Sequence, residues 1–179
     1  MTEKSLRFAR FTVLASFVLL VLSLGGSLYE HLVLDTVWID NPSVIRGASG
    51  GATRTYFWIP MHGAITLALV AALAATWKHR PARNAVLLGF GLYAVMRIWT
   101  FAYFVPLALE VESQTAPVLS PEMREASETW VRLSMLRFPL VTAAAIALGA
   151  ALRRLGPSRP KEPVARWTIP GRSEAGSAA

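Results

Sequence analysis

Four long apolar runs divide this 179-residue chain, and they constrain its fold more than any other feature. Each run has about the 20 residues that a helix rising about 1.5 Å per residue needs to cross a bilayer core of about 30 Å. Hydrophobic residues make up 54% of the chain and charged residues only 16%, which argues against a soluble domain. We therefore expect one all-α domain over residues 1–155, a four-helix transmembrane bundle with spans at about 11–34, 57–77, 85–109 and 130–152.

The basic residues follow a membrane topology rather than the pattern of a nucleic-acid-binding surface. The net charge is +7, and the Lys and Arg residues mostly flank the first run, fill the connection between the second and third, or follow the fourth. The two other connections are acidic. The positive-inside rule then predicts a multi-pass protein of the cell membrane with both termini in the cytoplasm. The basic stretch 156–179, rich in Pro, Gly, Ser and Ala, is predicted to be a disordered tail.

Two further features narrow the class of protein. The chain has no cysteine, which excludes disulfides, iron–sulfur clusters, thiolate-bound haem and thiol redox chemistry. The first run follows basic residues as a signal peptide would, but no Ala-x-Ala-like site follows it and the apolar character resumes at 32–34. We expect this run to be a retained membrane helix.

The first outer connection, residues 35–56, is long for a helical bundle. Its Gly47–Gly51 run predicts turns and a flexible hinge. Pro60 follows shortly afterwards, and we expect it in the first turn of the second helix, where its missing N–H does little harm.

The second outer connection ends in a helix-start signal. Ser120 is placed to cap a helix, with Pro121 at its first position. We expect the fourth helix to begin here and to run continuously inward, with a kink where Pro139 interrupts it. That kink would free the carbonyl near Met135 as a local acceptor for Arg137.

Three basic side chains fall at nearly the same depth inside the apolar runs. Counting from the basic residues at the inner ends puts Arg97 at about 21 Å, and Arg137 and His62 at about 24 Å. A guanidinium in hydrocarbon is costly, so such residues face a bundle interior or water. Glu30 and Glu110 are candidates to roof this layer from its outer side.

Each helix presents one polar or aromatic stripe at helical spacing, and bundle-core sites are assembled from such stripes. The catalytic candidates are His62, Arg97 and Arg137. The candidate substrate-binding residues are Glu30, Tyr93, Trp99, Phe101, Phe104, Trp130 and Ser134.

Each candidate also has a purely structural interpretation. Arg97 and Arg137 would then clamp loop carbonyls, or pair with Glu30 and Glu110 to fix the bundle. His62 would be an ordinary structural histidine. Three tryptophans are typical of the belt at a membrane interface: Trp38, Trp58 and Trp130.

A metal site is the remaining alternative. Its ligands would be a mixed nitrogen and oxygen set, Glu30, His31, His62 and Glu110. The chain has no Glu-x-x-His pair, and adjacent Glu30 and His31 point in different directions on an α-helix. Two nearby arginines also disfavour a dication. We therefore expect no cofactor, with a metal site kept as the less favoured alternative.

The fourth run carries a W-x6-R pattern, Trp130 to Arg137, and Phe104-Val-Pro106 precedes it at the outer end of the third. With these residues the chain resembles the anthrone-oxygenase-like family of small four-helix membrane proteins. Gly25-Gly26-Ser-Leu-Tyr29 in the first run is a further point of similarity. The resemblance implies oxygenation of an activated, phenol-like polycyclic carbon without metal or flavin.

Two hypotheses of function follow. On the resemblance, His62 would remove a proton, Arg97 and Arg137 would stabilise the enolate or phenolate, and the aromatic residues would hold a flat apolar substrate that enters from lipid. The alternative is a non-enzymatic bundle that binds a lipid or an anion, or an accessory subunit of a membrane complex. The expected partners are the lipid bilayer and a lipophilic small molecule. An oligomeric or membrane-complex partner stays open, and no nucleic acid is expected.

Overall fold

The computed structural model describes residues 2–156, and these residues form helices and connections without any strand. Four long helical segments, each apolar and long enough to cross a membrane, are Glu3–Leu34, Thr55–Thr76, Arg80–Ser113 and Pro121–Arg154. The predicted all-α four-helix bundle is confirmed, with segments that extend beyond the predicted spans. Large apolar side chains are exposed along the sides of the bundle, as expected for contact with lipid. The fold indicates a small, multi-pass integral membrane protein.

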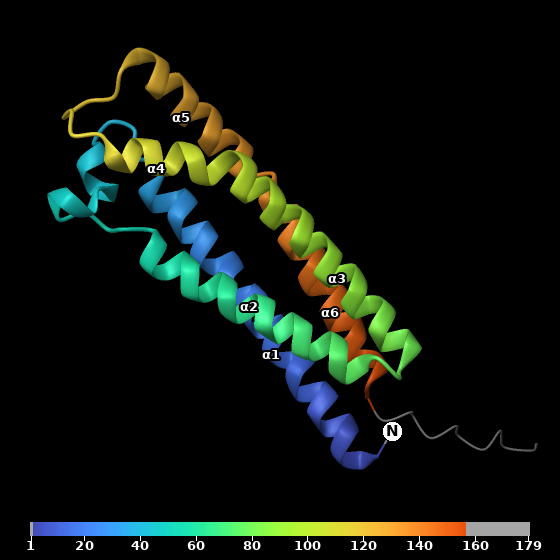
Figure 1. Ribbon diagram of the computed structural model, residues 1–179. Helices are drawn as coiled ribbons and strands as arrows, with labels where there is room; N and C mark the ends of the chain where they lie inside the picture. The colour runs from blue at the N-terminus through green and yellow to red at the C-terminus, as the bar shows by residue number, and fades with distance from the viewer. Residues whose placement is uncertain (1, 157–179) are drawn as a thin grey trace, which may run out of the picture.

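The bundle has two different ends (Figure 1). The N-terminal end of the first segment, the connection between the second and third, and the end of the fourth lie together, and we call this the basic end. The two longer connections lie at the opposite end, which we call the loop end. The positive-inside rule predicts that the basic end faces the cytoplasm. The predicted tail lies outside the described residues, apart from Gly156.

Helix α3 (Arg80–Trp99) packs along α6 (Arg137–Arg154), and α1 (Glu3–Tyr29) lies against α2 (Thr55–Thr76) and α6. Small residues let these helices approach closely, as is common in membranes. A Cβ added to Gly89 of α3 would lie only 3.1 Å from the carbonyl oxygen of Ala144 in α6. The α3–α6 pair is therefore the closely packed side of the bundle.

Two of the long segments change helix type in the half nearer the loop end. The first continues from α1 into a π-helical turn, η1 (Glu30–Leu34), and the third passes from α3 through η4 (Thr100–Phe104) into α4 (Val105–Ser113). In η1 the N–H of Asp35 donates to the carbonyl of Glu30, five residues earlier, at 2.9 Å. Such turns shift the side chains that follow them and are frequent at functional sites.

The fourth segment is broken rather than continuous. As predicted, the Ser120 hydroxyl caps the first turn of α5 (Pro121–Ser134) by accepting from the N–H of Met123. The segment is interrupted at residues 135–136, between the end of α5 at Ser134 and the start of α6 at Arg137, so the predicted kink is found there although the α-helix is not unbroken. The Met135 carbonyl accepts from the N–H of Phe138 at 3.1 Å, and Arg137 donates to the Ser134 carbonyl instead of the expected one near Met135.

Pro60 is also placed differently from the prediction. Because α2 begins at Thr55, Pro60 is its sixth residue and lies in the second turn. Its missing N–H removes the usual donor to the carbonyl four residues earlier, on Tyr56. Tyr56 is highly exposed, so that carbonyl lies at the periphery of the loop end.

The long first connection is an ordered cap over the loop end. It contains two short 3-10 helices, η2 (Pro42–Ile45) and η3 (Gly47–Ser49), where the sequence predicted a flexible hinge. Buried Arg46 fixes the connection by donating to the carbonyls of Val111, at 3.2 Å, and Ala116. Gly51 is required here, because a Cβ would collide with the backbone carbonyl oxygen of Ser43.

Candidate functional site

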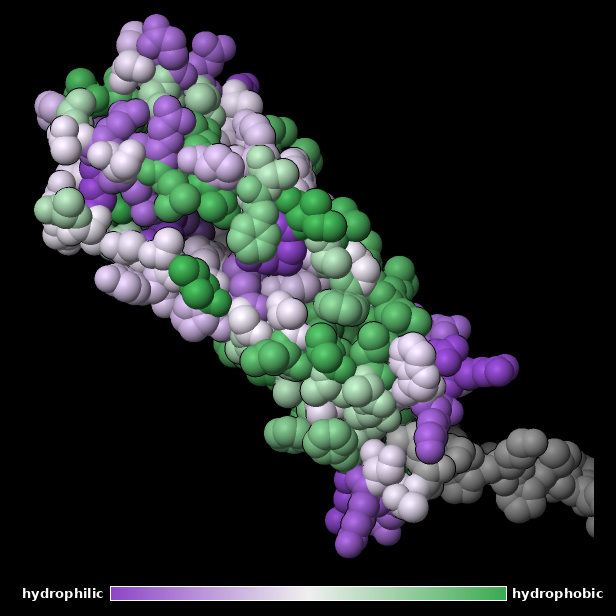
Figure 2. Space-filling view, viewed as in Figure 1, coloured by the Kyte–Doolittle hydropathy of each residue, from purple (hydrophilic) through white to green (hydrophobic). Residues whose placement is uncertain are grey.

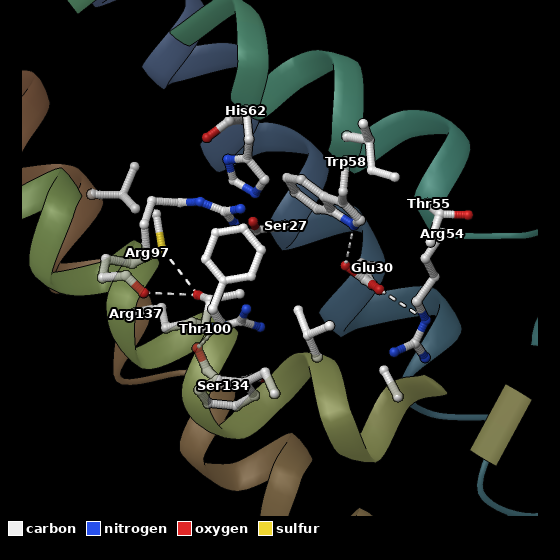
Figure 3. Close-up of a pocket in the computed structure, with 18 of the residues that line it drawn as sticks. Ser27, Glu30, Arg54, Thr55, Trp58, His62, Arg97, Thr100, Ser134 and Arg137 are labelled. Atoms are coloured by element: carbon white, nitrogen blue, oxygen red, sulfur yellow. Dashed lines mark hydrogen bonds and ion pairs between the residues drawn. The ribbon is translucent and has the colours of Figure 1, made fainter. Parts of the chain in front are cut away.

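A cavity of about 750 Å³ opens within the half of the bundle nearer the loop end. All four long segments line it, and its walls are mostly apolar, with a few polar groups that converge from different helices (Figure 3). Its size and its mixture of apolar walls and convergent polar groups are typical of small-molecule sites. We call it the outer cavity.

The structure brings most of the predicted site residues to this cavity. The lining includes His62, Arg97, Arg137, Glu30, Phe101, Phe104, Trp130 and Ser134. Two predicted residues are outside the lining. Tyr93 lies behind His62, and Trp99 packs edge-on against Phe104 with 5.2 Å between ring centres. Trp99 therefore belongs to an aromatic cluster next to the cavity.

Arg54, which the sequence did not single out, organises the acidic part of the cavity. Its Nε lies 3.0 Å from Oε1 of Glu30, and its Nη2 lies 3.6 Å from Oδ1 of Asp35. The indole N–H of Trp58 donates to the other oxygen of Glu30 at 3.0 Å (Figure 3). All of these side chains except Trp58 are almost fully buried. One guanidinium thus pairs with two acids.

Two tryptophans enclose that guanidinium. The Arg54 guanidinium carbon lies 5.0 Å from the ring centres of both Trp38 and Trp130. Each indole N–H is used internally, donating to Asp35 in one case and to the Phe104 carbonyl in the other. Both tryptophans are buried, so their predicted place in an interfacial belt is wrong. Their rings instead shield a buried ion pair from lipid and water.

The remaining acidic predictions are corrected in part. Glu110 is exposed and does not line the cavity, whereas Glu112 does. Adjacent Glu30 and His31 both line the cavity, although they were expected to point apart. They lie at the start of the π-helical turn, where the widened helix faces a broad space.

Arg97 and Arg137 have no carboxylate within 4 Å among residues 2–156. Arg97 lies against an aromatic face, with its guanidinium carbon 4.3 Å from the ring centre of Phe101. Arg137 has the same relation to Phe104 at 4.2 Å, and its Nε donates to the Ser134 carbonyl at 3.3 Å. The alternative in which these arginines pair with Glu30 and Glu110 is therefore wrong. Each guanidinium keeps donors that no described protein group uses.

His62 is held from two sides at the cavity wall. Its ring stacks on Trp58, with 5.2 Å between ring centres, and its Nδ1 lies 3.0 Å from the Tyr93 hydroxyl. That hydroxyl also lies 3.3 Å from the His62 carbonyl, to which it donates. When the hydroxyl donates to this carbonyl it accepts from Nδ1–H, and in that tautomer Nε2 carries the free lone pair.

Comparison with protein-family models, with curated proteins and with solved structures finds no match for this chain. The site must therefore be interpreted from its own geometry. Within the described residues, no three His, Asp or Glu side chains are grouped as metal ligands. The outer cavity instead combines two guanidinium groups that have no carboxylate within 4 Å among the described residues, one positioned imidazole and several aromatic faces.

The residues missed by sequence reasoning all lie just outside the predicted membrane spans. Arg54 and Asp35 lie at the borders of the long first connection, outside the apolar runs that were searched for buried charge. Glu112 lies two residues beyond the predicted candidate Glu110. It follows the π-helical turn η4, after which the side chains of the third segment point in different directions from those of a regular α-helix. The one sequence signal for this ion pair was that the first connection contains both basic and acidic residues.

Proposed function

We propose that this protein binds a lipophilic molecule bearing an anionic oxygen in the outer cavity, with Arg97 and Arg137 as the anion-binding groups. One observation carries the proposal. Both arginines line a mostly apolar cavity without a carboxylate partner in the described chain, while the nearby acids Glu30 and Asp35 are taken by Arg54.

The physical reason is the cost of an uncompensated charge. Removing a guanidinium from water costs several kcal/mol when no counter-charge or full set of acceptors replaces the solvent. The faces of Phe101 and Phe104 recover only about 0.5–2 kcal/mol each through cation–π contact. An anionic ligand would supply the missing charge and the acceptors, and charge-assisted hydrogen bonds to Arg are among the strong ones.

The proposal is tested by measuring the affinity of dodecanoate for the purified full chain in lipid nanodiscs. Arg97→Gln and Arg137→Gln are each expected to weaken binding by about tenfold or more, equivalent to about 1.4 kcal/mol. Arg132→Gln is the matched control, because Arg132 is exposed, does not line the cavity and hydrogen-bonds to the Thr129 hydroxyl. Equal affinity in all four proteins would overturn the proposal.

A second candidate function is supported by the position of His62 and by the W-x6-R residues. Trp130 donates to the Phe104 carbonyl, and Arg137 lies over both aromatic rings, so the residues that carry the resemblance to the anthrone-oxygenase-like family are in contact. With Nε2 of His62 available beside two guanidiniums, the cavity suits formation of a stabilised enolate.

In this reaction His62 takes one proton from an activated CH₂ group, and the guanidiniums stabilise the enolate oxygen. The carbanion is oxidised by O₂, which forms a C–O bond and a hydroperoxide after the proton returns. Loss of water from the hydroperoxide gives a ketone, so CH₂ + O₂ becomes C=O + H₂O. The four electrons that reduce one oxygen atom to the ketone and the other to water come from the substrate carbon.

The enzymatic candidate is tested by O₂ uptake with anthrone as substrate. Wild-type protein is expected to accelerate uptake and quinone formation above the buffer rate, and His62→Gln to lose about 10²-fold or more of that acceleration. His79→Asn is the control, since His79 only caps α3 and Asn preserves a cap. If wild-type protein binds dodecanoate but does not accelerate O₂ uptake, the enzymatic candidate is overturned and only the binding function stands.

A further inference from the structure

The walls of the outer cavity differ in exposure, and the difference marks an opening. The lining residues from α1, η1, α5 and α6 are buried or half-buried. The exposed lining residues, within the described chain, all lie on α2, η4 or α4: Ile59, Gly63, Thr66, Leu67, Phe101 and Leu109. The cavity is thus closed at the back and open between α2 and the η4–α4 segment. We call this opening the lateral mouth.

The rim of the lateral mouth is apolar and faces the side of the bundle. Leu67 is 73% exposed, Ile59 70%, Phe101 61% and Leu109 52%. In the space-filling view, hydrophilic residues are visible in a recess beside hydrophobic ones on this face (Figure 2). The ribbon view shows α2 diverging from the third segment toward the loop end (Figure 1). An apolar rim on the lipid-facing side admits molecules from the bilayer in preference to molecules from water.

Depth along the helices indicates how a ligand would lie. Leu67 is 11 residues from Lys78 at the basic end, or about 16 Å, close to the middle of a core of about 30 Å. Arg97 lies about 21 Å from that end, nearer the loop-end surface. An amphiphile in the leaflet at the loop end has its head toward that surface and its chain toward the middle. The cavity matches this orientation, because its charged groups lie nearer the loop-end surface and its apolar opening at Leu67 lies nearer the middle of the bilayer.

We propose that the natural ligand is a single-chain carboxylic acid of the lipid phase. It enters through the lateral mouth from the loop-end leaflet, with its carboxylate between Arg97 and Arg137 and its chain leaving past Leu67. This proposal rests on the anion-binding function above and names the ligand class. A volume of about 750 Å³ suits one chain or part of it, within the range of small-molecule sites. A single carboxylate supplies two oxygens for two guanidiniums on different helices.

Gly63 provides a direct way to close the mouth. It lies on the rim, and a Cβ built there meets no atom within 4 Å, so a large side chain can be added at the opening without a clash at its Cβ. Gly91 on α3 is the matched control, because it is also exposed and helical, has nothing within 4 Å of a built Cβ, and does not line the cavity. Both positions lose the same glycine and gain the same side chain.

The experiment uses hexadecanoic acid with a photoreactive diazirine near the end of its chain, added to the full-length protein in nanodiscs. Wild-type and Gly91→Phe proteins are expected to be labelled on α2 near Leu67 or on η4–α4, and dodecanoate should compete. Gly63→Phe is expected to lose about tenfold of this labelling. A second variant, Leu67→Trp, narrows the exit from the same rim and is expected to shift labelling away from α2.

The outcomes separate the two proposals. In one outcome, dodecanoate displaces the labelling and Arg97→Gln abolishes it, which supports anion binding. If that labelling maps to other surfaces, or persists fully in Gly63→Phe and Leu67→Trp, the lateral mouth is overturned while anion binding stands. Wild-type labelling that is neither displaced by dodecanoate nor sensitive to Arg97→Gln overturns both. Labelling at the mouth that both rim variants reduce supports the proposal.

Discussion

The guanidinium of Arg54 lies 3.0 Å from the carboxylate of Glu30, joining the start of α2 to the end of the first helix. This ion pair decides the electrostatic character of the outer cavity. Glu30 and Asp35 both line the cavity, and Arg54 pairs with both of them. Under the proposed function, Arg97 and Arg137 are then available to an external anion.

We predict that Arg54→Gln destabilises the fold strongly. The substitution leaves Glu30 and Asp35 buried with their main counter-charge removed, and breaking a buried pair in this way typically costs about 3–5 kcal/mol. The measurement is the thermal unfolding midpoint in detergent. Arg124→Gln is the control, because it removes an ion pair to Asp40 that is largely exposed, and little change is expected. Equal midpoints for the two variants would contradict this role of Arg54.

We also predict that Arg54 affects anion binding without contacting the anion. Glu30 and Arg137 already interact electrostatically across the cavity, so an unpaired Glu30 would compete for Arg137. Dodecanoate affinity should fall in Arg54→Gln and recover in the double variant Arg54→Gln/Glu30→Gln. If the double variant binds as weakly as the single one, Glu30 is not the competitor.

The close contact between α3 and α6 gives a prediction about stability. Gly89→Val places a side chain against the Ala144 carbonyl, where even a Cβ would lie at 3.1 Å, and overpacking of this kind costs about 1–3 kcal/mol. Gly91→Val on the same helix meets open space and carries the same change in helix propensity. The unfolding midpoint of Gly89→Val should be clearly lower than that of Gly91→Val.

A fourth prediction concerns the cap over the loop end. Arg46→Gln removes the donors to the carbonyls of Val111 and Ala116 and shortens a buried side chain. Amide hydrogen exchange should become faster in residues 42–54 and 111–118, while exchange in the core of α3 and α6 stays unchanged. Uniformly faster exchange over the whole chain would mean that Arg46 supports global stability instead.

Sequence reasoning succeeded where helix geometry alone determines position. The constant rise per residue placed His62, Arg97 and Arg137 at one level, and their stripes do meet at one cavity. Sequence reasoning failed where the backbone departs from a regular α-helix. The π-helical turns brought His31 and Glu112 to the cavity, and the break after Ser134 redirected Arg137 to the Ser134 carbonyl.

The partner of Glu30 could not be predicted for a different reason. Arg54 belongs to a connection whose path depends on Arg46 and on two short 3-10 helices, and no periodicity in the sequence describes such a path. Its enclosure by Trp38 and Trp130 likewise reversed the interface-belt prediction for both tryptophans. Buried ion pairs that involve a loop need the tertiary structure before they can be assigned.

The central claim is that Arg97 and Arg137 bind one anion together. The most direct measurement is a solid-state NMR distance experiment on nanodisc-bound protein, between carboxyl-¹³C dodecanoate and ¹⁵N-labelled arginine side chains. The signals are assigned with the Arg97→Gln and Arg137→Gln variants. We predict that the carboxylate lies within about 4 Å of guanidinium nitrogens of both residues, as in an ion pair. A carboxylate near neither guanidinium, or near one only, would contradict the claim.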